Sequence, residues 1–545
     1  MKPITLFTIL LFVGVTVELA RAGTFNVLDY GAVPGDGQDD LPGIQAAIAA
    51  AAAGDTVFLP CGVYTLSGSL VPKSGQRIMG AGRDCTVLEY AGGNLNPLIR
   101  LQTAGSNTNI ELTGFTLDGM NSVLASQGIE ASGGGGHFFH DLRFRNFVAN
   151  AAYGPHGIYC SGGVVNCRIV ECDFSNIGTN IGWGGAVRLS WGSTGAQIIS
   201  NTIHSTGRGG ILLDNHSTDA VIRGNSITNS GVSGPGLGIE VWGGCDRALI
   251  EDNVLDHWLS LESSSNVAVR RNRVSDRSGV IKYIGLEFAS QGTNVVFADN
   301  IVDGGAHVGW SVSGGGVKDN VLFLRNTIRR CETWGAQLQG EGGGATGFFH
   351  QGSVFELTQN TQSLYPYQGH GFRVNGSIRD CAWVQCQFNR NTGLGMQWRT
   401  DDDVNHPINR YTLMSGTFTN NGSDALPFWE APSVTDLYAA DNTSINNGNS
   451  ILPSTTGFAG NAAPALTLDV PAVIYAGVPA TFGSTFTDDG SLARQLWDFG
   501  DGLPRSEANP TFTYTAPGNY TVFCVVWDNG GRPAWAQTNI TVVLR

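Results

Sequence analysis

The feature that most constrains the fold is a short unit of asparagine, any residue and an aliphatic residue, which returns along the chain. From residue 200 onward the unit begins at Asn201, Asn225, Asn253, Asn272, Asn300 and Asn326, with spacings of 24, 28, 19, 28 and 26 residues. A recurrence of this length is typical of solenoid proteins. Each unit alternates apolar and polar residues and then breaks at glycine, serine or asparagine. It therefore predicts one coil of a parallel β-helix rather than a helical repeat, with asparagine side chains hydrogen-bonded from coil to coil.

A second pattern, glycine followed by apolar, variable and apolar residues, recurs in most coils. Alternate residues of a strand face opposite sides, so the variable residues are expected to form one exposed column, with coils about 4.8 Å apart. The predicted column is Glu130, Tyr159, Arg188, Leu212, Glu240, a coil left open near Leu261 and Glu262, then Glu287, Ser311, Gln337, Arg373 and Gln397. A neighbouring column, two residues further along, is Ser132, Ser161, Ser190, Asp214, Trp242, Ala289, Ser313, Gln339, Asn375 and Arg399.

The N-terminal region carries a family resemblance. Phe25–Asp40, Ile44–Ile48 and Gly54–Tyr64 closely resemble the opening of right-handed parallel β-helices of the pectate-lyase superfamily. Asp39 or Asp40 is expected to N-cap a helix with Pro42 in its first turn. One apolar face of that helix would plug the open end of the solenoid, and its residues are Ile44, Ala47, Ile48 and Ala51. The expected fold is all-β, a right-handed parallel β-helix (solenoid) over residues 23–451 with an N-terminal helical cap and roughly thirteen coils.

The C-terminal region carries a second resemblance. Trp497–Gly502, Phe512–Tyr514 and Pro517–Tyr520 resemble a polycystic-kidney-disease (PKD) type domain, which implies an immunoglobulin-like β-sandwich over residues 467–545. Residues 452–466 are rich in small residues and proline and are interpreted as a linker. Domains of this type accompany secreted hydrolases or surface proteins as spacers or substrate-binding modules. We expect Asp498 and Asp501 to set a turn rather than to bind metal.

Residues 1–22 have the pattern of a secretory signal peptide. Lys2 is followed by an apolar run from Ile4 to Val17 and by a small-residue cleavage site at Ala20–Ala22. The alternative is an N-terminal membrane anchor, and no other stretch of the sequence is long enough to span a bilayer. We therefore expect a secreted or cell-surface (extracellular) protein.

Composition narrows the classes of partner and ligand. The net charge of −14 argues against nucleic acid and anionic membranes as partners, and the oligomeric state is left open. Cys61 and Cys85 lie 24 residues apart, about one coil, so they could stack and form a disulfide, and the other cysteines are interpreted as core residues. No Walker loop, His-Glu-x-x-His, nucleophile elbow or zinc-type cysteine spacing is present. We expect no cofactor and no metal, with calcium left open.

Chemistry is expected in the middle coils, where acids, a cation and aromatic residues converge. The candidate catalytic residues are Asp214, Glu240, Glu287, Arg188 and Tyr159. Glu240 and Glu287 would lie two coils apart, roughly 9–10 Å, near the upper end of the range for the carboxyl pair of an inverting glycosidase. Asp214 and Glu240, in adjacent coils, could form the same pair. A lyase would instead use a cation such as Arg188, Arg373, Arg399 or Lys282 to neutralise a uronate, and Tyr159 or His156 as base.

Substrate contacts are expected along the same sheet, where tryptophan faces can stack on sugar rings. The candidate substrate-binding residues are His156, Trp183, Trp242, His307, Gln337, Gln339, His370, Arg373 and Arg399. The segment Tyr153–His156 resembles part of a motif of alginate C5-epimerases, without its aspartate and glutamate. Gly369–Gly371 resembles the Gly-His-Gly of polygalacturonases, without the paired aspartates.

These patterns predict a secreted carbohydrate-active enzyme, a polysaccharide lyase or glycoside hydrolase, which cleaves an extracellular polysaccharide in a groove along one sheet. One alternative is a non-catalytic surface or adhesive β-helix protein that binds polysaccharide. A further alternative is a uronan epimerase. The column could also be a solvated face with ordinary salt bridges between coils.

Overall fold

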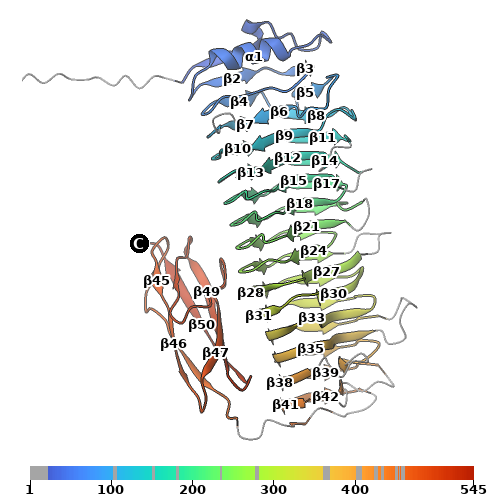
Figure 1. Ribbon diagram of the computed structural model, residues 1–545, viewed down its shortest axis with the longest axis vertical. Helices are drawn as coiled ribbons and strands as arrows, with labels where there is room; N and C mark the ends of the chain where they lie inside the picture. Colours follow the sequence, from blue (N-terminus) through green and yellow to red (C-terminus); the bar gives the residue numbers. More distant parts are fainter. Residues whose placement is uncertain are drawn as a thin grey trace, which may run out of the picture.

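The computed structural model is 55% strand and 3% helix. It describes residues 22–101, 107–149, 154–179, 183–232, 236–275, 282–359, 369–399, 408–422, 428–430, 435–447, 452, 454–455 and 461–545. Strands wind into a parallel β-solenoid of about 12 turns, with a smaller β-sandwich beside it (Figure 1). The fold class predicted from the repeat and from the two terminal resemblances is confirmed. Residues 1–21, which make up nearly all of the predicted signal peptide, lie outside the described residues.

A short helical cap closes the N-terminal end of the solenoid (Figure 1). It consists of the 3-10 helix η1 (Val27–Tyr30) and the α-helix α1 (Leu41–Ala50). The predicted apolar face of α1 is buried, at 0% exposure for Ile44, Ala47 and Ile48. Asp40 is the N-cap residue, but its carboxylate accepts hydrogen bonds from the backbone of Val33 and Thr65, so it fixes the cap to the first coil.

Each coil contributes strands to three faces, and the first face carries the predicted column; we call it the site face. Its strands are β6 (Ile99–Leu101), β9 (Gln127–Ser132), β12 (His156–Ser161), β15 (Gly185–Leu189), β18 (Gly209–Leu213), β21 (Leu237–Trp242), β24 (Leu259–Glu262), β27 (Lys282–Ala289), β30 (Ala306–Ser313), the first part of β33 (Trp334–Gln351), the first part of β35 (His370–Val384), β37 (Met396–Arg399) and β40 (Phe428–Glu430).

The second face carries the contact with the sandwich, and we call it the docking face. Its strands are β1 (Thr24–Asn26), β2 (Thr56–Leu59), β4 (Arg77–Gly80), β7 (Glu111–Thr113), β10 (Phe138–His140), β13 (Arg168–Val170), β16 (Gln197–Ile199), β19 (Val221–Arg223), β22 (Leu249–Glu251), β25 (Ala268–Arg270), β28 (Gly292–Ala298), β31 (Lys318–Leu324), the second parts of β33 and β35, β38 (Ile408–Met414) and β41 (Thr435–Ala440).

The third face is a separate parallel sheet. Its strands are β3 (Gly62–Leu66), β5 (Thr86–Tyr90), β8 (Thr116–Asp118), β11 (Arg143–Phe147), β14 (Asp173–Ile177), β17 (Thr202–Thr206), β20 (Ser226–Thr228), β23 (Val254–Leu255), β26 (Arg273–Ser275), β29 (Ile301–Asp303), β32 (Thr327–Arg329), β34 (Val354–Glu356), β36 (Gln387–Asn389), β39 (Thr417–Thr419) and β42 (Thr443–Ile445).

The repeated asparagines form a ladder inside the solenoid, as predicted. The Nδ2 of Asn201 donates to the Oδ1 of Asn225 at 3.0 Å, and the bond is repeated through the other four asparagines of the pattern. The coil of only 19 residues keeps the bond, with Asn253 Nδ2 2.9 Å from Asn272 Oδ1. Variation in coil length is therefore absorbed outside the ladder.

The cysteines follow the interpretation drawn from their spacing. Cys61 and Cys85 form a disulfide between adjacent coils. The other eight cysteines, all within the described residues, are buried thiols. They act as small apolar residues of the core.

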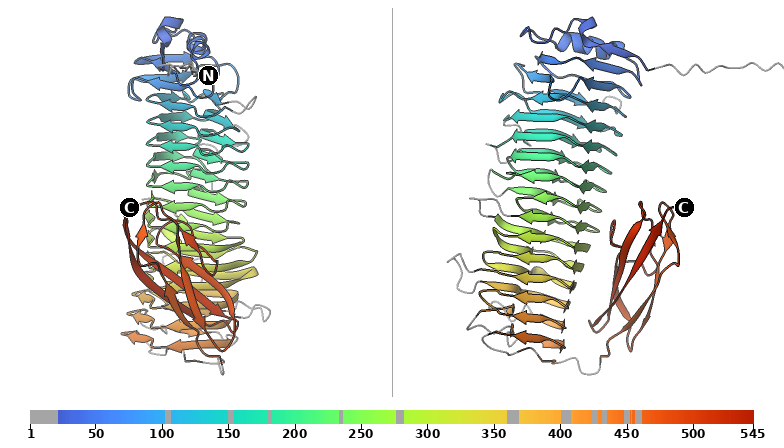
Figure 2. Two further views of the ribbon diagram at one scale, coloured as in Figure 1. Left: turned by 90° about the vertical axis from the view of Figure 1, so that its left-hand side faces the viewer. Right: turned by 180° about the vertical axis from the view of Figure 1, so that it is seen from behind.

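The sandwich is built from β43 (Ala465–Asp469), β44 (Ile474–Tyr475), β45 (Ala480–Thr481), β46 (Gly483–Thr487), β47 (Leu492–Asp498), β48 (Thr511–Phe512), β49 (Gly518–Asp528) and β50 (Pro533–Val543). It lies alongside the C-terminal half of the solenoid rather than beyond its end (Figures 1 and 2). Asp498 and Asp501 accept the backbone N–H groups of Gly500 and Gly502, so they set the predicted turn. Asp498 also forms a buried ion pair with Arg270 of β25.

An apolar contact joins the sandwich to the docking face. Phe349 of β33 lies 5.7 Å from Phe523, 6.1 Å from Trp527 and 5.4 Å from Trp535 between ring centroids. The sandwich is thus packed on the solenoid rather than tethered to it by the linker alone. Within the described residues, no helix is long and apolar enough to cross a membrane.

Candidate functional site

The predicted column exists as one line of register across the site face. Tyr159 pairs with Glu130 and Arg188, and the line continues through Leu212 to Glu240. Ser260, not Leu261 or Glu262, fills the coil that the sequence left open, because it pairs with both Glu240 and Glu287. Beyond Glu287 the line continues as predicted through Ser311, Gln337, Arg373 and Gln397.

The expected exposure of this column is wrong in the middle coils. Arg188 is 4% exposed, and Glu287 and Gln337 are each 8% exposed. The reason is lateral bonding, since polar side chains on coils about 4.8 Å apart reach one another and exclude water. Gln337 Nε2, for example, donates to Ser311 Oγ at 3.2 Å.

A hollow of about 290 Å³ lies on the site face across four successive coils, β15, β18, β21 and β24. This volume is near the lower end of the roughly 300–1,000 Å³ of small-molecule pockets. Its lining residues are Trp183, Arg188, Arg208, Leu212, Leu213, Asp214, Glu240, Trp242 and Glu262. Trp183 is 50% exposed and Trp242 is 40% exposed, so both indole rings offer apolar surface to a ligand.

Two ion pairs form the floor of the hollow. Arg188 donates to Asp214, and the two side chains are 5% and 7% exposed. Arg208 holds both oxygens of Glu240, with its Nε 3.1 Å from Oε2 and a terminal nitrogen 2.5 Å from Oε1. The Arg208 guanidinium also lies 5.4 Å from the centre of the Trp183 ring. These contacts hold the long arginine side chains in place across neighbouring coils.

Glu287 is the acid whose ionisation is most altered at this site. Its burial raises the pKa of its carboxyl to about 6, and the charge of Glu262 adds to the rise. Ser260 Oγ donates to Glu287 Oε2 at 2.6 Å and Ser313 Oγ donates to Oε1 at 3.4 Å, which oppose the rise. A carboxyl with this pKa is partly protonated near neutral pH and can donate a proton.

Glu262 is the second acid of this group. It lies at the end of β24, in register with Ala289, and its Oε1 accepts a hydrogen bond from Ser290 Oγ at 3.0 Å. Glu262 and Glu287 occupy adjacent coils, offset by two residues along the strand, which corresponds to about 8 Å between Cα atoms. Glu240 and Glu287 are two coils apart, as predicted, or about 10 Å.

Two of the predicted substrate-binding histidines lie in the interior. His156 is 0% exposed, and its burial holds the pKa of the ring well below its usual range, helped by the charge of Arg188. His370 is 5% exposed, accepts the backbone N–H of Leu394 at 2.9 Å, and has a pKa lowered by burial to about 4. Neither ring can stack on a polymer, because each is covered by its own coils. Tyr159 lies on His156, with ring centroids 5.7 Å apart.

The remaining candidates lie in other coils than the hollow. Gln339 and Arg373 are half-buried, and the Arg373 guanidinium lies 4.7 Å from the centre of the Trp334 ring. His307 Nδ1 is 3.8 Å from Glu332 Oε2. The side chains of Arg399 and Lys282 lie outside the described residues. The structure thus brings together Arg188, Asp214, Glu240 and Trp242 with Trp183, and places the other candidates along the face on either side.

Family models match both the solenoid and the C-terminal sandwich. Residues 24–235 match the family model described as rhamnogalacturonase A/epimerase, pectate lyase-like, and residues 185–361 match the right handed beta helix region. Residues 461–543 match the PKD domain. The N-terminal part of the solenoid is thus pectate-lyase-like, and the C-terminal sandwich is a PKD domain. Both resemblances drawn from the sequence are confirmed.

Several curated proteins are similar to parts of this β-helix protein. Mannuronan C5-epimerase AlgE3 of Azotobacter vinelandii is 38% identical over 111 residues, 18% of this chain and 6% of that protein. Alginate lyase 7 of the same organism is 40% identical over 108 residues, 17% of this chain and 12% of that protein. Collagenase ColA of Bacillus cereus is 43% identical over 58 residues, 11% of this chain and 6% of that protein. The match thus covers a small part of the length of each relative.

Among solved structures, one is similar over most of the chain and another over a short segment. The A-module of mannuronan C-5 epimerase AlgE6 of Azotobacter vinelandii has a TM-score of 0.44 and 16% identity, covering 77% of this chain and 99% of that chain. The PKD1 domain of Vibrio anguillarum Epp has a TM-score of 0.15 and 30% identity, covering 16% of this chain and 99% of that chain.

Two charged residues of the hollow, Glu262 and Arg208, are not among the site residues predicted from the sequence. Glu262 falls in the coil that the sequence leaves open, which is 19 residues long and lacks the glycine that marks the strand elsewhere. Arg208 precedes β18 instead of lying in either column, and its partner is decided by the reach of a long side chain. Placing β24 in register, by counting from the asparagine ladder on both sides, is the signal that could have found Glu262.

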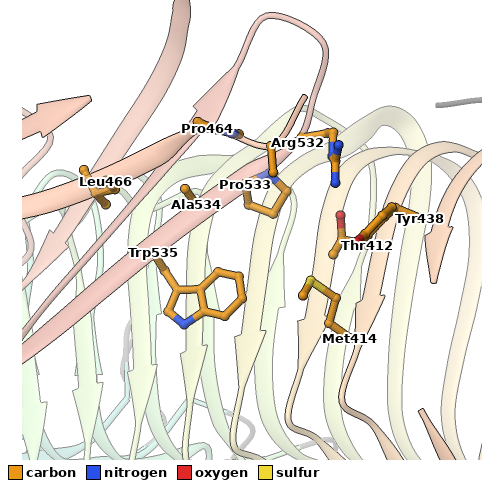
Figure 3. Close-up of a pocket in the computed structure, with 10 residues that line it drawn as sticks. Thr412, Met414, Tyr438, Pro464, Leu466, Arg532, Pro533, Ala534 and Trp535 are labelled. Atoms are coloured by element: carbon orange, nitrogen blue, oxygen red, sulfur yellow. The ribbon is translucent and has the colours of Figure 1, made fainter. Parts of the chain in front are cut away.

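A second hollow, of about 230 Å³, lies at the seam between the PKD domain and the docking face. Pro533 and Trp535 of β50 lie across it from Thr412 and Met414 of β38 (Figure 3). The Arg532 guanidinium is 4.3 Å from the centre of the Tyr438 ring. The described residues that line this hollow include no carboxylate.

Proposed function

We propose that this protein is a secreted carbohydrate-active enzyme that cleaves glycosidic bonds of an extracellular polysaccharide on the site face, where the hollow borders β27 and its Glu287. The observation that carries the proposal is the Glu287 carboxyl, whose pKa is raised to about 6 beside a second carboxyl, Glu262. Glycoside hydrolysis uses a pair of carboxyl groups, one of which donates a proton to the glycosidic oxygen. Trp183 and Trp242 at the rim supply surface on which sugar rings can stack.

The proposed reaction uses the two acids in sequence with a water molecule. Glu287 donates its proton to the glycosidic oxygen as the bond from that oxygen to the anomeric carbon breaks. Glu262 accepts a proton from the water whose oxygen forms the new bond to the anomeric carbon. The roughly 6.5–9.5 Å of inverting enzymes is a distance between carboxyl groups, and Cα atoms about 8 Å apart allow the two side chains to reach it.

The arginine-bound acids have a positioning role in this proposal. Asp214 and Glu240 are each bonded to an arginine, so their oxygens are less available to a substrate than those of Glu262. They hold Arg188 and Arg208 in the floor of the hollow. His156 and Tyr159 support that floor from the preceding coil, whereas Gln337, Gln339 and Arg373 extend the surface that a long polymer would cross.

Two alternatives have specific support. The similarity of part of the chain to mannuronan C5-epimerases and to an alginate lyase favours epimerase or lyase chemistry on a polyuronate. The hydrogen bonds between side chains of neighbouring coils in the column favour a non-catalytic polysaccharide-binding solenoid.

Two further points concern the ends of the chain. The predicted signal peptide over residues 1–22 supports secretion. We also propose that the PKD domain begins near residue 461 rather than 467.

The test is a screen of the purified protein on a panel of polysaccharides with three readouts. New reducing ends without ultraviolet absorbance support hydrolysis. Reducing ends with absorbance of an unsaturated product support a lyase, and a changed sugar composition without cleavage supports an epimerase. Binding with none of these products supports the non-catalytic alternative and removes the catalytic proposal.

A further inference from the structure

Both arginines that line the hollow are paired with a carboxylate. Its lining contains two arginines, Arg188 and Arg208, and three acids, Asp214, Glu240 and Glu262. Each arginine is bonded to one acid, which leaves a formal charge of 2 − 3 = −1 on Glu262. Glu287, in the next coil on β27, is a further acid. The hollow is therefore neutral to negative, not basic.

The bonding geometry makes the arginines poor ligands for a further anion. The Arg188–Asp214 pair is buried, with 5% and 7% of the side chains exposed. Arg208 uses two donors of its planar group on the two oxygens of Glu240, at 3.1 and 2.5 Å. A bidentate pair of this kind satisfies the fork that would otherwise hold a substrate carboxylate. An incoming carboxylate would have to displace Glu240 and would also be repelled by Glu262.

We propose that the polymer bound in this hollow is an uncharged polysaccharide, recognised by stacking and hydroxyl hydrogen bonds, and not a polyuronate. The inference rests on the proposed function in one respect, that the hollow is the place where the polymer lies. Sugar rings would stack on Trp183 and Trp242, while the Glu262 carboxylate accepts hydrogen bonds from hydroxyl groups. A neutral chain meets no charge repulsion from the acids of the hollow.

The first test compares polymers that differ in charge alone. Alginate and polygalacturonate are each paired with their carboxyl-reduced forms, and neutral glucans, mannans, galactans and xylans complete the panel. Binding is measured by affinity electrophoresis with the Glu287→Gln variant, with and without added calcium, so that cleavage does not affect the result. We expect retardation by at least one neutral polymer and none by the charged partners. Stronger retardation by a polyuronate, or none by any neutral polymer, would overturn the inference.

The second test removes the carboxylate that binds Arg208 in the hollow. Glu240→Gln removes the charge that holds Arg208, and the variant should gain affinity for polyuronate by about tenfold, since a hydrogen bond to a charged group contributes about that much. The control is Glu130→Gln, which makes the same change of charge at another coil of the column, where Glu130 Oε2 is 3.6 Å from Arg100. Equal gains in the two variants, or none in Glu240→Gln, would contradict the role given to the Arg208–Glu240 pair. Thermal melts establish that both variants are folded.

The two proposals fail in different ways. If the wild-type protein binds a neutral polymer but never cleaves it, the catalytic role of Glu287 is wrong, while the proposal of an uncharged ligand stands. If the protein cleaves a polyuronate and does not act on its carboxyl-reduced form, the protein is still an enzyme, but the proposal of an uncharged substrate is wrong.

Discussion

Arg270 of the β-helix and Asp498 of the PKD domain form an ion pair in which each side chain is 1% exposed. Arg270 also donates to the backbone carbonyl of Gly502 at 3.3 Å. Two buried charges bonded in this way cost much free energy when one of them is removed, because the other is left without a partner. Together with the packing of Phe349 against the sandwich, the pair makes the PKD domain a fixed part of the fold and not a free spacer.

Arg270→Ala should detach the PKD domain from the solenoid. Removal of one partner of a buried pair typically costs about 3–5 kcal/mol. Differential scanning calorimetry should then resolve a separate, lower transition for the sandwich. Arg247→Ala is the control, because the Arg247–Asp219 pair has side chains that are 47% and 41% exposed, and pairs of that kind contribute about 0–1 kcal/mol. The double variant Arg270→Met with Asp498→Leu should recover most of the loss, and equal melting of all variants would contradict the fixed docking.

Asn272→Ala should weaken the solenoid at its shortest coil. Its Nδ2 donates to Ile250 O at 2.9 Å and to Asn300 Oδ1 at 3.1 Å, and its Oδ1 accepts from Asn253. Buried groups left without a hydrogen bond cost about 1–3 kcal/mol each, so urea denaturation should show a loss of at least that size. Asn447→Ala, at the end of a second ladder that begins at Asn391, should cost less, because Asn447 is only partly buried.

Glu287→Gln should lower the turnover of an active polysaccharide substrate by about 10²–10⁴-fold, the usual contribution of general acid catalysis. Binding should change little, because the amide keeps an oxygen that can accept the hydrogen bond of Ser260. Glu130→Gln is the matched control and should retain full turnover. An equal rate for Glu287→Gln and the wild type would place the chemistry elsewhere on the site face.

Much of the fold and the register could be predicted from the sequence because both depend on short-range patterns. The asparagine ladder fixes the coils, and the glycine that precedes the alternating residues in most site-face strands fixes which side chain faces outward. Docking of the PKD domain was not predicted, although β28 and β31 carry a signal. Val295–Ala298 and Val321–Leu324 are runs of consecutive apolar residues, and a strand that is apolar on both faces must be covered on both.

The candidate site was predicted only in part. The positions of Arg188, Asp214, Glu240 and Glu287 follow from the register, but their bonding partners do not. Whether a glutamate is held by an arginine or buried alone depends on how far a long side chain reaches across coils, as Arg208 does toward Glu240. Such contacts decide which acid is bound to an arginine and which is available for the reaction. The sequence repeat does not encode them, so they could not be predicted from it.

The raised pKa of Glu287 predicts an unusual dependence of stability on pH. The pKa of about 6 in the folded protein lies above the ordinary glutamate value of 4.5, so the folded state holds this proton more tightly than the unfolded state. The contribution of Glu287 to stability is therefore present below about pH 4.5 and is lost as pH rises through about 6. Glu287→Gln removes the ionisation, so its stability relative to the wild type should increase by about 2 kcal/mol between pH 4 and pH 8. Melting temperatures of the two proteins across this range provide the measurement, and a constant difference would contradict a buried acid.

Glu262→Gln should move the ionisation of Glu287 as well as slow the reaction. The charge of Glu262 is one of the causes that raise the pKa of Glu287, so its removal should lower that pKa toward the ordinary value. The alkaline limb of the pH–rate profile, where Glu287 loses the proton it donates, should then shift to lower pH. Carbon NMR of the labelled glutamates measures the same change without substrate. Glu332→Gln, which removes a carboxylate beside His307 in a later coil, is the control and should leave the limb in place. A lowered rate with an unmoved limb would mean that Glu262 serves the reaction without interacting with Glu287, and the two acids would not form the proposed pair.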